Sequence, residues 1–275
     1  RIGFPMYLYS VTLEAKTQLE EWYPGKFTIT SDRADYDYIY EQANLAELPG
    51  RRFQKKRNHV SRFIRENPDW QFHPLTKEDL PAIRAFNDAW SQLYENKDNP
   101  GIQTEHTSIE LLFDNFDKLD LRGGYVTAGG RIVAFSFGSP INDRVFDTHV
   151  EKALYDVTGA YNIINREMAR NVCAGFDLIN REDDVGDEGL RAAKLSYNPD
   201  IIEPKYLAAL NREGERPWTV WHGGKNFPRL RNCLLIPLEG PSSLQCRCWR
   251  ILPERGTFLP PGRTARAPRC SVPCR

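Results

Sequence analysis

Apolar and polar residues recur with two different periods along this chain, and the changes of period predict strands interleaved with helices. Between residues 144 and 150 polar and apolar side chains alternate singly, which predicts a strand. From residue 158 to residue 172 the apolar positions recur three and four residues apart, which predicts a helix with one buried face. The order expected in this central stretch is a strand at 144–150, a helix at 158–172 that Thr158 caps and Gly175 ends, a strand at 176–179, and a helix at 187–196 stopped by Pro199.

The same criteria predict further elements before this stretch. Gly129 and Gly130 join two strands as a hairpin, Thr12 caps a helix, and Thr76 with Asp79 has the spacing of a capping box. We expect strands at 4–11, 27–30, 36–40, 70–74, 124–128 and 131–139, and helices at 12–22, 51–65, 76–90 and 105–116. This order predicts an α/β fold, in which polar residues at the ends of strands form the site.

The end of the chain differs in composition from the rest. Residues 212–275 hold twelve Lys and Arg against four Asp and Glu, with five of the six cysteines and nine of the nineteen prolines. Residues 1–211 hold 25 Lys and Arg against 33 Asp and Glu, which argues against nucleic-acid binding by bulk charge, although not against a local basic patch. We expect the body to end near Leu210 and residues 211–275 to be an irregular or disordered tail.

Several classes of protein are disfavoured by the sequence. No apolar run approaches the roughly 20 residues that a membrane-spanning helix needs, so we expect no membrane span and a cytoplasmic location. Cys173, alone in the body, is interpreted as a buried thiol. The cysteines of the tail lack paired Cys-x-x-Cys spacing, so we expect no metal site.

The most basic run of the body lies at residues 51–65, directly after the break at 48–50. On a helix its apolar residues would face the core and its basic residues the solvent. Two interpretations stay open, namely an anion site for the phosphates of a donor or a solvated basic face that balances the acidic body. The first interpretation assigns phosphate binding to Lys55, Lys56, Arg57 and Asn58.

Candidate catalytic residues follow the two strands of the central stretch, because open α/β sheets bind ligands beyond the carboxyl ends of their strands. Such a site needs a base that can remove a proton and a cation that can stabilise developing negative charge. His149 and Glu151 are the candidate bases, and the guanidinium of Arg181 suits an oxyanion, a carboxylate or a phosphate. The binding residues expected in the same cleft are Lys152, Asn180, Arg191, Lys194 and Tyr197.

Each candidate also has a purely structural interpretation. His149 could be a packed or half-exposed residue of a strand, and Glu151 with Lys152 could form a surface pair worth under about 1 kcal/mol. The acidic residues 182–184 could stabilise the N-terminus of the following helix. Arg181 could be a partner in a structural ion pair.

Three separated motifs carry a resemblance to a known family. They are residues 48–59, residues 151–153 and residues 179–199. In these motifs the chain resembles bacterial soluble proteins related to the C-terminal domain of phosphatidylglycerol lysyltransferase. The resemblance covers roughly residues 1–210 and implies a truncated tandem repeat of a GNAT-like acyltransferase fold. It implies that residues 1–48 are the end of a first unit whose beginning is missing, and that residues 49–210 form a second unit.

The resemblance implies aminoacyl transfer. The lysyltransferases move an aminoacyl group from charged tRNA to a lipid hydroxyl, and the related Fem transferases use charged tRNA to build peptidoglycan bridges. We therefore expect an aminoacyltransferase with charged tRNA as its donor and no bound cofactor. The acceptor is left open among a lipid, a peptide and a small molecule.

Two other functions stay open on the same scaffold. One is acetyl-CoA-dependent N-acetylation, whose enzymes carry a doubled glycine between strand and helix, where backbone N–H groups bind the pyrophosphate. Residues 153–160 lack that doubled glycine, and Asp156 would face the phosphates. The other is a non-enzymatic binding protein on a degenerate transferase scaffold, because fold alone does not fix function.

Overall fold

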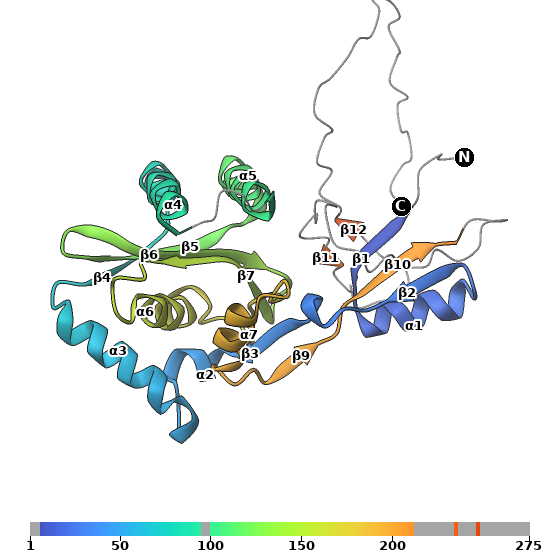
Figure 1. Cartoon of the computed structure of the whole chain (residues 1–275), viewed down its shortest axis with the longest axis horizontal. Coiled ribbons are helices and arrows are strands. Elements are labelled where there is room, and N and C mark those ends of the chain that lie inside the picture. Colours follow the sequence, from blue (N-terminus) through green and yellow to red (C-terminus); the bar gives the residue numbers. More distant parts are fainter. Residues whose placement is uncertain (1–5, 95–99, 212–233, 236–245, 248–275) are drawn as a thin grey trace, which may run out of the picture.

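The structure, a computed structural model, describes residues 6–94, 100–211, 234–235 and 246–247, and the side chains of 6–94 and 105–211. Two larger sheets organise most of these residues, and a third sheet has two short strands (Figure 1). The strands are β1 Tyr7–Val11, β2 Phe27–Thr30, β3 Asp37–Glu41, β4 Gln71–Pro74, β5 Arg122–Ala128, β6 Arg131–Pro140, β7 Val145–Ala153, β8 Leu178–Asn180, β9 Ile201–Glu203, β10 Tyr206–Leu210, β11 Leu234–Leu235 and β12 Cys246–Arg247. The helices are α1 Leu13–Trp22, α2 Gln42–Glu47, α3 Gln54–Glu66, α4 Leu80–Tyr94, α5 Pro100–Asp114, α6 Ala160–Glu167 and α7 Glu188–Leu195.

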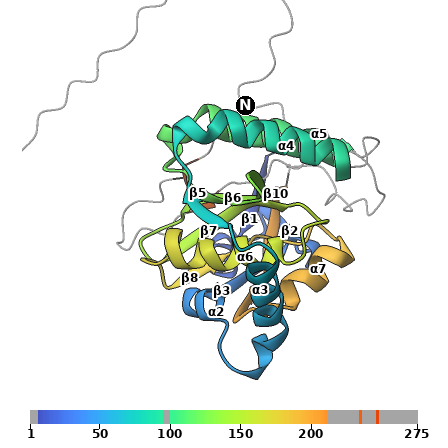
Figure 2. The same ribbon diagram turned by 90° about the vertical axis from the view of Figure 1, so that its left-hand side faces the viewer.

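The larger sheet has seven strands in the order β4-β5-β6-β7-β8-β3-β9, and the smaller has three in the order β1-β10-β2. In the larger sheet β7 and β8 are parallel neighbours, and the other neighbouring pairs are antiparallel. Helices α4 and α5 cover one face of this sheet, and α3 and α6 cover the other (Figures 1 and 2). Within the described residues no helix combines the length and apolar character needed to cross a membrane.

Local signals in the sequence are confirmed at several element ends. Thr12 Oγ1 accepts a hydrogen bond from the backbone N–H of Ala15, so Thr12 caps α1. Thr76 and Asp79 form the expected capping box in the turn that leads into α4. The hairpin at residues 129–130 joins β5 to β6.

The helix expected at 158–172 differs from the prediction at both ends. It begins at Ala160, and its N-cap is Gly159, with φ 83°, instead of Thr158. A Cβ atom at residue 159 would lie 2.6 Å from the carbonyl oxygen of His59, so a glycine here lets α3 approach α6 closely. The α-helix ends at Glu167, and residues Met168–Val172 form a π-helical turn.

The expected boundary at residue 48 does not separate the two sheets. β3 lies between β8 and β9 in the larger sheet, where Tyr38 and Tyr40 are completely buried. β10 lies between β1 and β2 in the smaller sheet. The chain therefore passes between the sheets twice, after β2 and after β9 (Figure 1). The expectation for residues 211–275 falls outside the described residues, apart from Asn211 and the short strands β11 and β12, which pair with each other.

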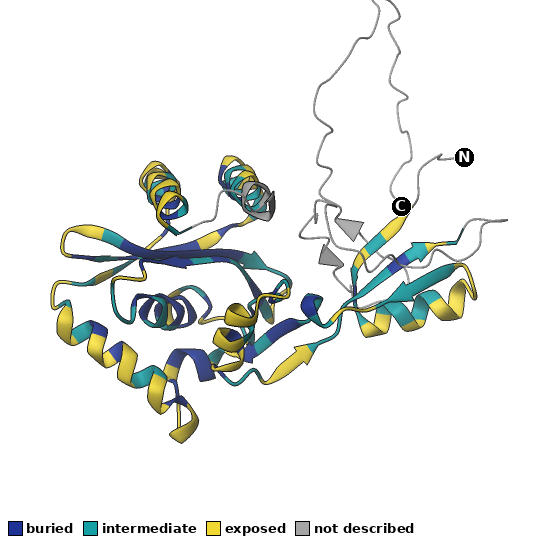
Figure 3. Ribbon diagram, viewed as in Figure 1, coloured by how far each residue is buried: buried dark blue, intermediate teal, exposed yellow. Residues whose placement is uncertain are grey.

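Two apolar clusters fill the spaces between the larger sheet and its helices. One lies under α4 and α5, and the other joins α3 and α6 to β3, β7 and β8, with buried residues along these elements in Figure 3. Each large side chain buried there contributes about 1.5–3 kcal/mol relative to an exposed one. Cys173 belongs to the second cluster as a buried free thiol, and burial raises its pKa to about 12.

The parallel pair β7–β8 comes apart toward its carboxyl end. The two strands pair at Val145–Leu178, Phe146–Ile179 and Asp147–Asn180, after which β8 ends while β7 continues to Ala153. Beyond Asn180 the chain instead follows β3, because Arg181 N donates to Tyr38 O at 2.9 Å and Tyr38 N donates to Glu182 O at 3.2 Å. Side chains, not paired strands, therefore connect β7 to residues 181–184.

A β-bulge lies in β7 at the same place. The pairing with β6 shifts between Phe137–Val150 and Gly138–Thr148, which leaves His149 as the extra residue. A Cβ atom at Gly138 would lie 1.8 Å from the carbonyl oxygen of Asp147, so only a glycine fits opposite the bulge. The bulge changes which side chains of β7 face the end of β8.

Candidate active site

Two pairs of side chains connect β7 to the segment after β8. Arg181 Nη2 donates to Glu151 Oε1 at 2.8 Å, and His149 Nδ1 lies 3.1 Å from Glu182 Oε1. Both pairs are largely shielded from solvent, since the exposed fraction of these side chains lies between 5% and 18%. The structure thus joins Glu151 to Arg181 and His149 to Glu182, at the strand ends where the sequence predicts a cleft.

The guanidinium of Arg181 packs on two aromatic rings. Its central carbon lies 5.1 Å from the centroid of Tyr197 and 5.7 Å from that of Tyr40. Burial lowers the pKa of Arg181, but the carboxylate of Glu151 and the two phenols outweigh it, so the pKa is raised and the group is charged. Its Nη1 is buried and has no hydrogen-bond partner within the described residues. A buried unpaired donor costs about 1–3 kcal/mol, so this atom is a candidate donor to a ligand.

Glu151 is held by both of its carboxylate oxygens. Its Oε2 accepts a hydrogen bond from Asn165 Nδ2 on α6 at 3.0 Å, while Oε1 accepts from Arg181. The Oδ1 atom of Asn165 is buried without a partner among the described residues. Within the part of the chain that the structure describes, the surroundings of Glu151 therefore contain one unpaired donor, on Arg181, and one unpaired acceptor, on Asn165.

Lys56 is the residue of the basic run that reaches this cluster. Its Nζ lies 3.9 Å from the ring centroid of Tyr197 and donates to Ser196 Oγ at 2.6 Å. Burial and then the charge of Arg181 lower the pKa of Lys56 to about 8, against the opposing effect of Glu151. Two cations, Lys56 and Arg181, thus lie near the single carboxylate of Glu151.

The other three candidates of the basic run lie elsewhere. Arg57 donates to the carbonyl oxygens of Leu48 and Gly50 at 2.5 and 2.6 Å, so it closes the turn before α3 and does not project toward the cluster. Lys55 and Asn58 are exposed to solvent, and Asn58 accepts a hydrogen bond from Gln54 one turn earlier. Of these four residues Lys56 reaches the cluster and Arg57 holds the turn before α3, while phosphate binding by the run stays a prediction.

Lys152 and Asn180 do not belong to the expected cleft. Lys152 projects from the face of β7 opposite to Glu151, where its Nζ lies 4.4 Å from the ring of Trp90 on α4 and 4.0 Å from Glu105 on α5. Asn180 donates to Asp37 Oδ2 at 2.7 Å and accepts from the backbone N–H of Glu182 at 2.9 Å. Both side chains are occupied in holding the fold.

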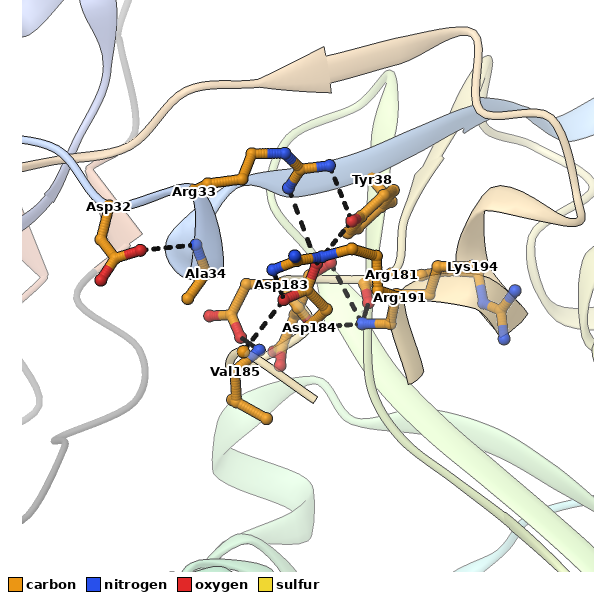
Figure 4. A network of polar contacts seen from close by, with 12 residues as sticks. Asp32, Arg33, Ala34, Tyr38, Arg181, Asp183, Asp184, Val185, Arg191 and Lys194 are labelled. Atoms are coloured by element: carbon orange, nitrogen blue, oxygen red, sulfur yellow. Dashed lines mark hydrogen bonds and ion pairs between the residues drawn. The ribbon is translucent and has the colours of Figure 1, made fainter. Parts of the chain in front are cut away.

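Arg191 is bound by a buried carboxylate instead of facing Arg181 (Figure 4). Its Nε and Nη2 donate to the two oxygens of Asp184 at 2.7 and 2.8 Å, and the Asp184 side chain is completely buried. Tyr38 also donates to Asp184, at 2.5 Å. The hydrogen bonds from Arg191 hold the pKa of Asp184 well below its usual range, despite burial. Arg191 therefore contacts Asp184, and its expected binding role stays a prediction.

Lys194 acts on the backbone that carries the site. Its Nζ donates to the carbonyl oxygens of Arg181 at 2.5 Å, of Glu182 at 3.1 Å and of Asp183 (Figure 4). Burial and the charge of Arg181 lower its pKa to about 8. Lys194 thus positions Arg181 and Glu182 through their main chain. Tyr197, the last of the expected binding residues, lies beneath Arg181, and its hydroxyl accepts from Asn162 at 2.7 Å.

A second polar group surrounds His149. Its Nε2 lies 2.8 Å from Ser139 Oγ on β6, and Asp147 Oδ2 lies 3.7 Å from its Nδ1. Burial lowers the pKa of His149, but the hydrogen bond with Glu182 and the charges of Asp147 and Glu182 outweigh it, so the pKa is raised. Burial, and then the charge of Glu182, raise the pKa of Asp147 well above its usual range.

Sequence reasoning missed Ser139 and did not assign Asp147 or Glu182 as partners of His149. Ser139 pairs with Asp147 across the β6–β7 ladder. Aligning the predicted strand at 131–139 with the predicted strand at 144–150 could therefore have placed Ser139 near His149. One donor atom from each of Asp147, His149 and Glu182 lies within 4.8 Å of the others. Such a set also has the composition of a divalent-cation site. In this structure, however, the two ring nitrogens of His149 lie within hydrogen-bond distance of Ser139 and Glu182.

The junction before α6 differs from a pyrophosphate-binding loop. The approach of His59 to Gly159 places α3 against the N-terminus of α6. Asp156 lies 3.7 Å from Arg131 and accepts a hydrogen bond from Tyr94 at 3.4 Å, so its charge is partly neutralised within the protein. These contacts disfavour a phosphate at this helix N-terminus.

Comparison with known proteins adds a family to this geometry. Residues 1–209 match the model of the family "Phosphatidylglycerol lysyltransferase, C-terminal". A conserved protein of unknown function from Bacteroides thetaiotaomicron VPI-5482 has a crystal structure that is similar with a TM-score of 0.72 and 40% identity, over 75% of this chain and 70% of that one. The C-terminal domain of a protein assigned as a lysylphosphatidylglycerol synthetase from Agrobacterium fabrum has a TM-score of 0.57 at 15% identity, over 76% of this chain and 68% of that one.

A curated relative is the uncharacterized protein MYCGA3080 of Mycoplasmoides gallisepticum, which is 24% identical over 205 residues. The match covers 73% of this chain and 65% of the relative, so the chain spans less than two thirds of that protein's length. The likeness to the Agrobacterium domain shows a common fold, and the expected α/β fold is confirmed.

Proposed function

Because the chain belongs to the family of phosphatidylglycerol lysyltransferase C-terminal domains, a family of the aminoacyltransferase kind, we propose that it transfers an aminoacyl group from charged tRNA. The observation that carries the proposal is the pair of unpaired polar atoms beside Glu151, namely Arg181 Nη1 and Asn165 Oδ1. An aminoacyl ester offers a carbonyl oxygen that accepts hydrogen bonds and an ammonium group that donates them. The two atoms complement these two groups.

Charge supports the same assignment. Glu151 is a buried carboxylate that suits the α-ammonium of the donor, and Arg181 supplies a rigid cation to the carbonyl oxygen. The carbonyl oxygen gains negative charge in the transition state, where one preorganised donor contributes about 3–4 kcal/mol. Lys56, near Arg181, is then suited to a phosphate of the tRNA terminus.

Of the two expected bases, His149 is the better placed. Both oxygens of Glu151 are engaged by Arg181 and Asn165, which favours a binding role for this carboxylate. His149 is fixed by hydrogen bonds at both ring nitrogens and lies two residues before Glu151 on the same strand. It is therefore our candidate for the group that removes a proton during transfer.

The test uses pooled tRNA charged with radiolabelled amino acids, with phosphatidylglycerol vesicles and a peptide mixture as two separate acceptor arms. Label should move to one acceptor with the wild-type protein. Arg181→Lys keeps the charge but loses the planar fork, so it should reduce the transfer rate at least tenfold with little change in melting temperature. Arg62→Lys, on the exposed face of α3, is the matched control and should transfer at the wild-type rate.

Three outcomes would contradict the proposal. Transfer from acetyl-CoA without transfer from any charged tRNA would favour the acetyltransferase alternative. No transfer and no binding of charged tRNA would favour a binding protein on the same scaffold. An Arg181→Lys protein that unfolds, while its folded fraction transfers at the normal rate, would make Arg181 a structural partner of Glu151.

A further inference from the structure

We propose that Ser139, His149 and Glu182 form a nucleophile–base–acid triad, and that Ser139 accepts an acyl group from small esters as a covalent intermediate. The proposal goes beyond the proposed function, because it needs neither tRNA nor an aminoacyl group. It rests on a hydrogen-bonded chain of three side chains from three different segments, β6, β7 and the residues after β8.

The distances match the roles. Ser139 Oγ lies 2.8 Å from His149 Nε2, and His149 Nδ1 lies 3.1 Å from Glu182 Oε1. A nucleophile that bonds one ring nitrogen while a carboxylate bonds the other is the arrangement by which such triads are recognised, whatever the fold. The His149 side chain is only 5% exposed, whereas Ser139 is half-buried, so the hydroxyl is the member that an ester can reach.

The backbone of Glu182 is held in a costly conformation. Its φ is 54°, in the left-handed region that a glutamate rarely adopts. Asn180 accepts a hydrogen bond from its N–H, and Tyr38 N and Lys194 Nζ donate to its carbonyl oxygen. The main chain is thus fixed so that the side chain reaches His149, and strain of this kind concentrates at functional sites.

Asp147 is the second carboxyl near His149, and it is less suited to orient the ring. Its Oδ2 lies 3.7 Å from Nδ1, beyond hydrogen-bond distance, and its Oδ1 is buried without a partner among the described residues. Glu182 is closer and therefore holds the ring, as a positioning residue. The bulge at His149 and the glycine opposite it set the ring between Ser139 and Glu182.

The chemistry balances without a further reagent. Ser139 Oγ bonds to the carbonyl carbon of the ester while its proton moves to His149 Nε2. The tetrahedral adduct expels the alcohol oxygen, which takes that proton and leaves an acyl-serine. Water then attacks the acyl carbon and gives a proton to Nε2, and Ser139 recovers that proton as the carboxylic acid leaves.

The experiment measures hydrolysis of p-nitrophenyl acetate and labelling by phenylmethanesulfonyl fluoride. The wild-type protein should hydrolyse the ester and gain one sulfonyl group, mapped by peptide mass to Ser139. Ser139→Ala and His149→Gln should lose the label and at least about 100-fold in kcat/KM. Ser136→Ala is the matched control, because Ser136 lies on the same strand and its hydroxyl has no partner among the described residues. It should keep the label and the wild-type rate.

Glu182→Gln tests the positioning role separately. Loss of the carboxylate lowers the pKa of His149, so the pH at which kcat/KM reaches half its maximum should move down while the label still forms on Ser139. The charged groups in contact with His149 are Asp147 on β7 and Glu182, with Lys205 and Asp37 behind them. An unchanged pH midpoint would overturn the role of Glu182.

Other outcomes would overturn the triad itself. Labelling at another residue, no labelling of the wild-type protein, or equal losses in Ser136→Ala and Ser139→Ala would do so. A metal-dependent reaction would also overturn it. In that case a chelator would abolish hydrolysis, and the wild-type protein would hold one equivalent of zinc that the His149→Gln protein lacks. If Ser139→Ala fails to fold, Ser139→Cys replaces it. Peptide mass distinguishes its new thiol from the five cysteines of residues 212–275, and it should be alkylated at pH 7 while the buried Cys173 stays unmodified. Failure of the tRNA assay leaves these readouts unaffected.

Discussion

Lys56 Nζ lies 3.9 Å above the ring of Tyr197, and the guanidinium of Arg181 packs on the same ring. This contact joins the basic helix α3 to the strand ends that carry the candidate site. It also separates Lys56 from Lys55, its neighbour in the sequence, which is exposed. Adjacent lysines on one helix therefore have different environments, and they provide a matched pair for experiment.

We expect Lys56→Met to weaken the binding of charged tRNA, and Lys55→Met to have little effect. If Lys56 contacts one phosphate, its loss should reduce the slope of log K against log salt by about 0.7–0.9. Binding titrations at several salt concentrations measure this slope for both variants. Equal effects of the two substitutions would favour the other interpretation, in which the whole basic run is a solvated basic face.

The pH dependence of binding should also depend on Lys56. Its pKa is lowered to about 8, so the side chain is charged below that pH and becomes neutral above it. The affinity of the wild-type protein for charged tRNA should fall between pH 7 and pH 9, by up to about tenfold. The Lys56→Met protein should show a flatter profile over the same range. A wild-type profile as flat as that of the variant would contradict a charge role for Lys56.

Asp184 should be among the residues most important for stability. Its completely buried carboxylate binds Arg191 with both oxygens and accepts from Tyr38. Asp184→Ala leaves these partners without an acceptor and should lower the free energy of unfolding by about 3 kcal/mol, measured by urea denaturation. Glu188→Ala, in the exposed first turn of α7, is the control and should change it by less than about 1 kcal/mol.

Acid should remove the contribution of Asp184. Its folded-state pKa is lowered, so its stabilisation is complete above the unfolded pKa of about 3.9 and is lost as the pH falls toward the folded pKa. The difference in unfolding free energy between wild type and Asp184→Asn should therefore shrink below about pH 4. A difference that stays constant between pH 7 and pH 3 would show that the charge of Asp184 is not its source.

Gly138→Ala should disrupt the bulge at His149. The added Cβ would lie 1.8 Å from the backbone oxygen of Asp147, which cannot move without breaking the β6–β7 ladder. We expect a large fall in melting temperature. Gly175→Ala is the control, because nothing lies within 4 Å of its Cβ position and its φ is not in the left-handed region. A Gly138→Ala protein as stable as this control would show that the bulge does not require a glycine opposite it.

Much of the fold follows from local sequence patterns. Single alternation and spacings of three and four identified most strands and helices before Pro199, and Thr12 and Asp79 identified two helix starts. The patterns did not predict α2, β9 or β10. The strand-end rule also brought Glu151 and Arg181 to the same place, because the ends of parallel neighbouring strands lie at one edge of a sheet. These signals act within a few residues or between two consecutive strands.

The tertiary structure decided which polar groups meet. In the folded protein β3 lies between β8 and β9, Arg191 binds Asp184, and Lys152 packs on Trp90. It also set Ser139 against His149 through the register of β6 and β7. Periodicity reports the burial and backbone angles of one element, whereas the partner of a side chain depends on strand order and register. Those are fixed by contacts between segments far apart in the chain, which no local pattern contains.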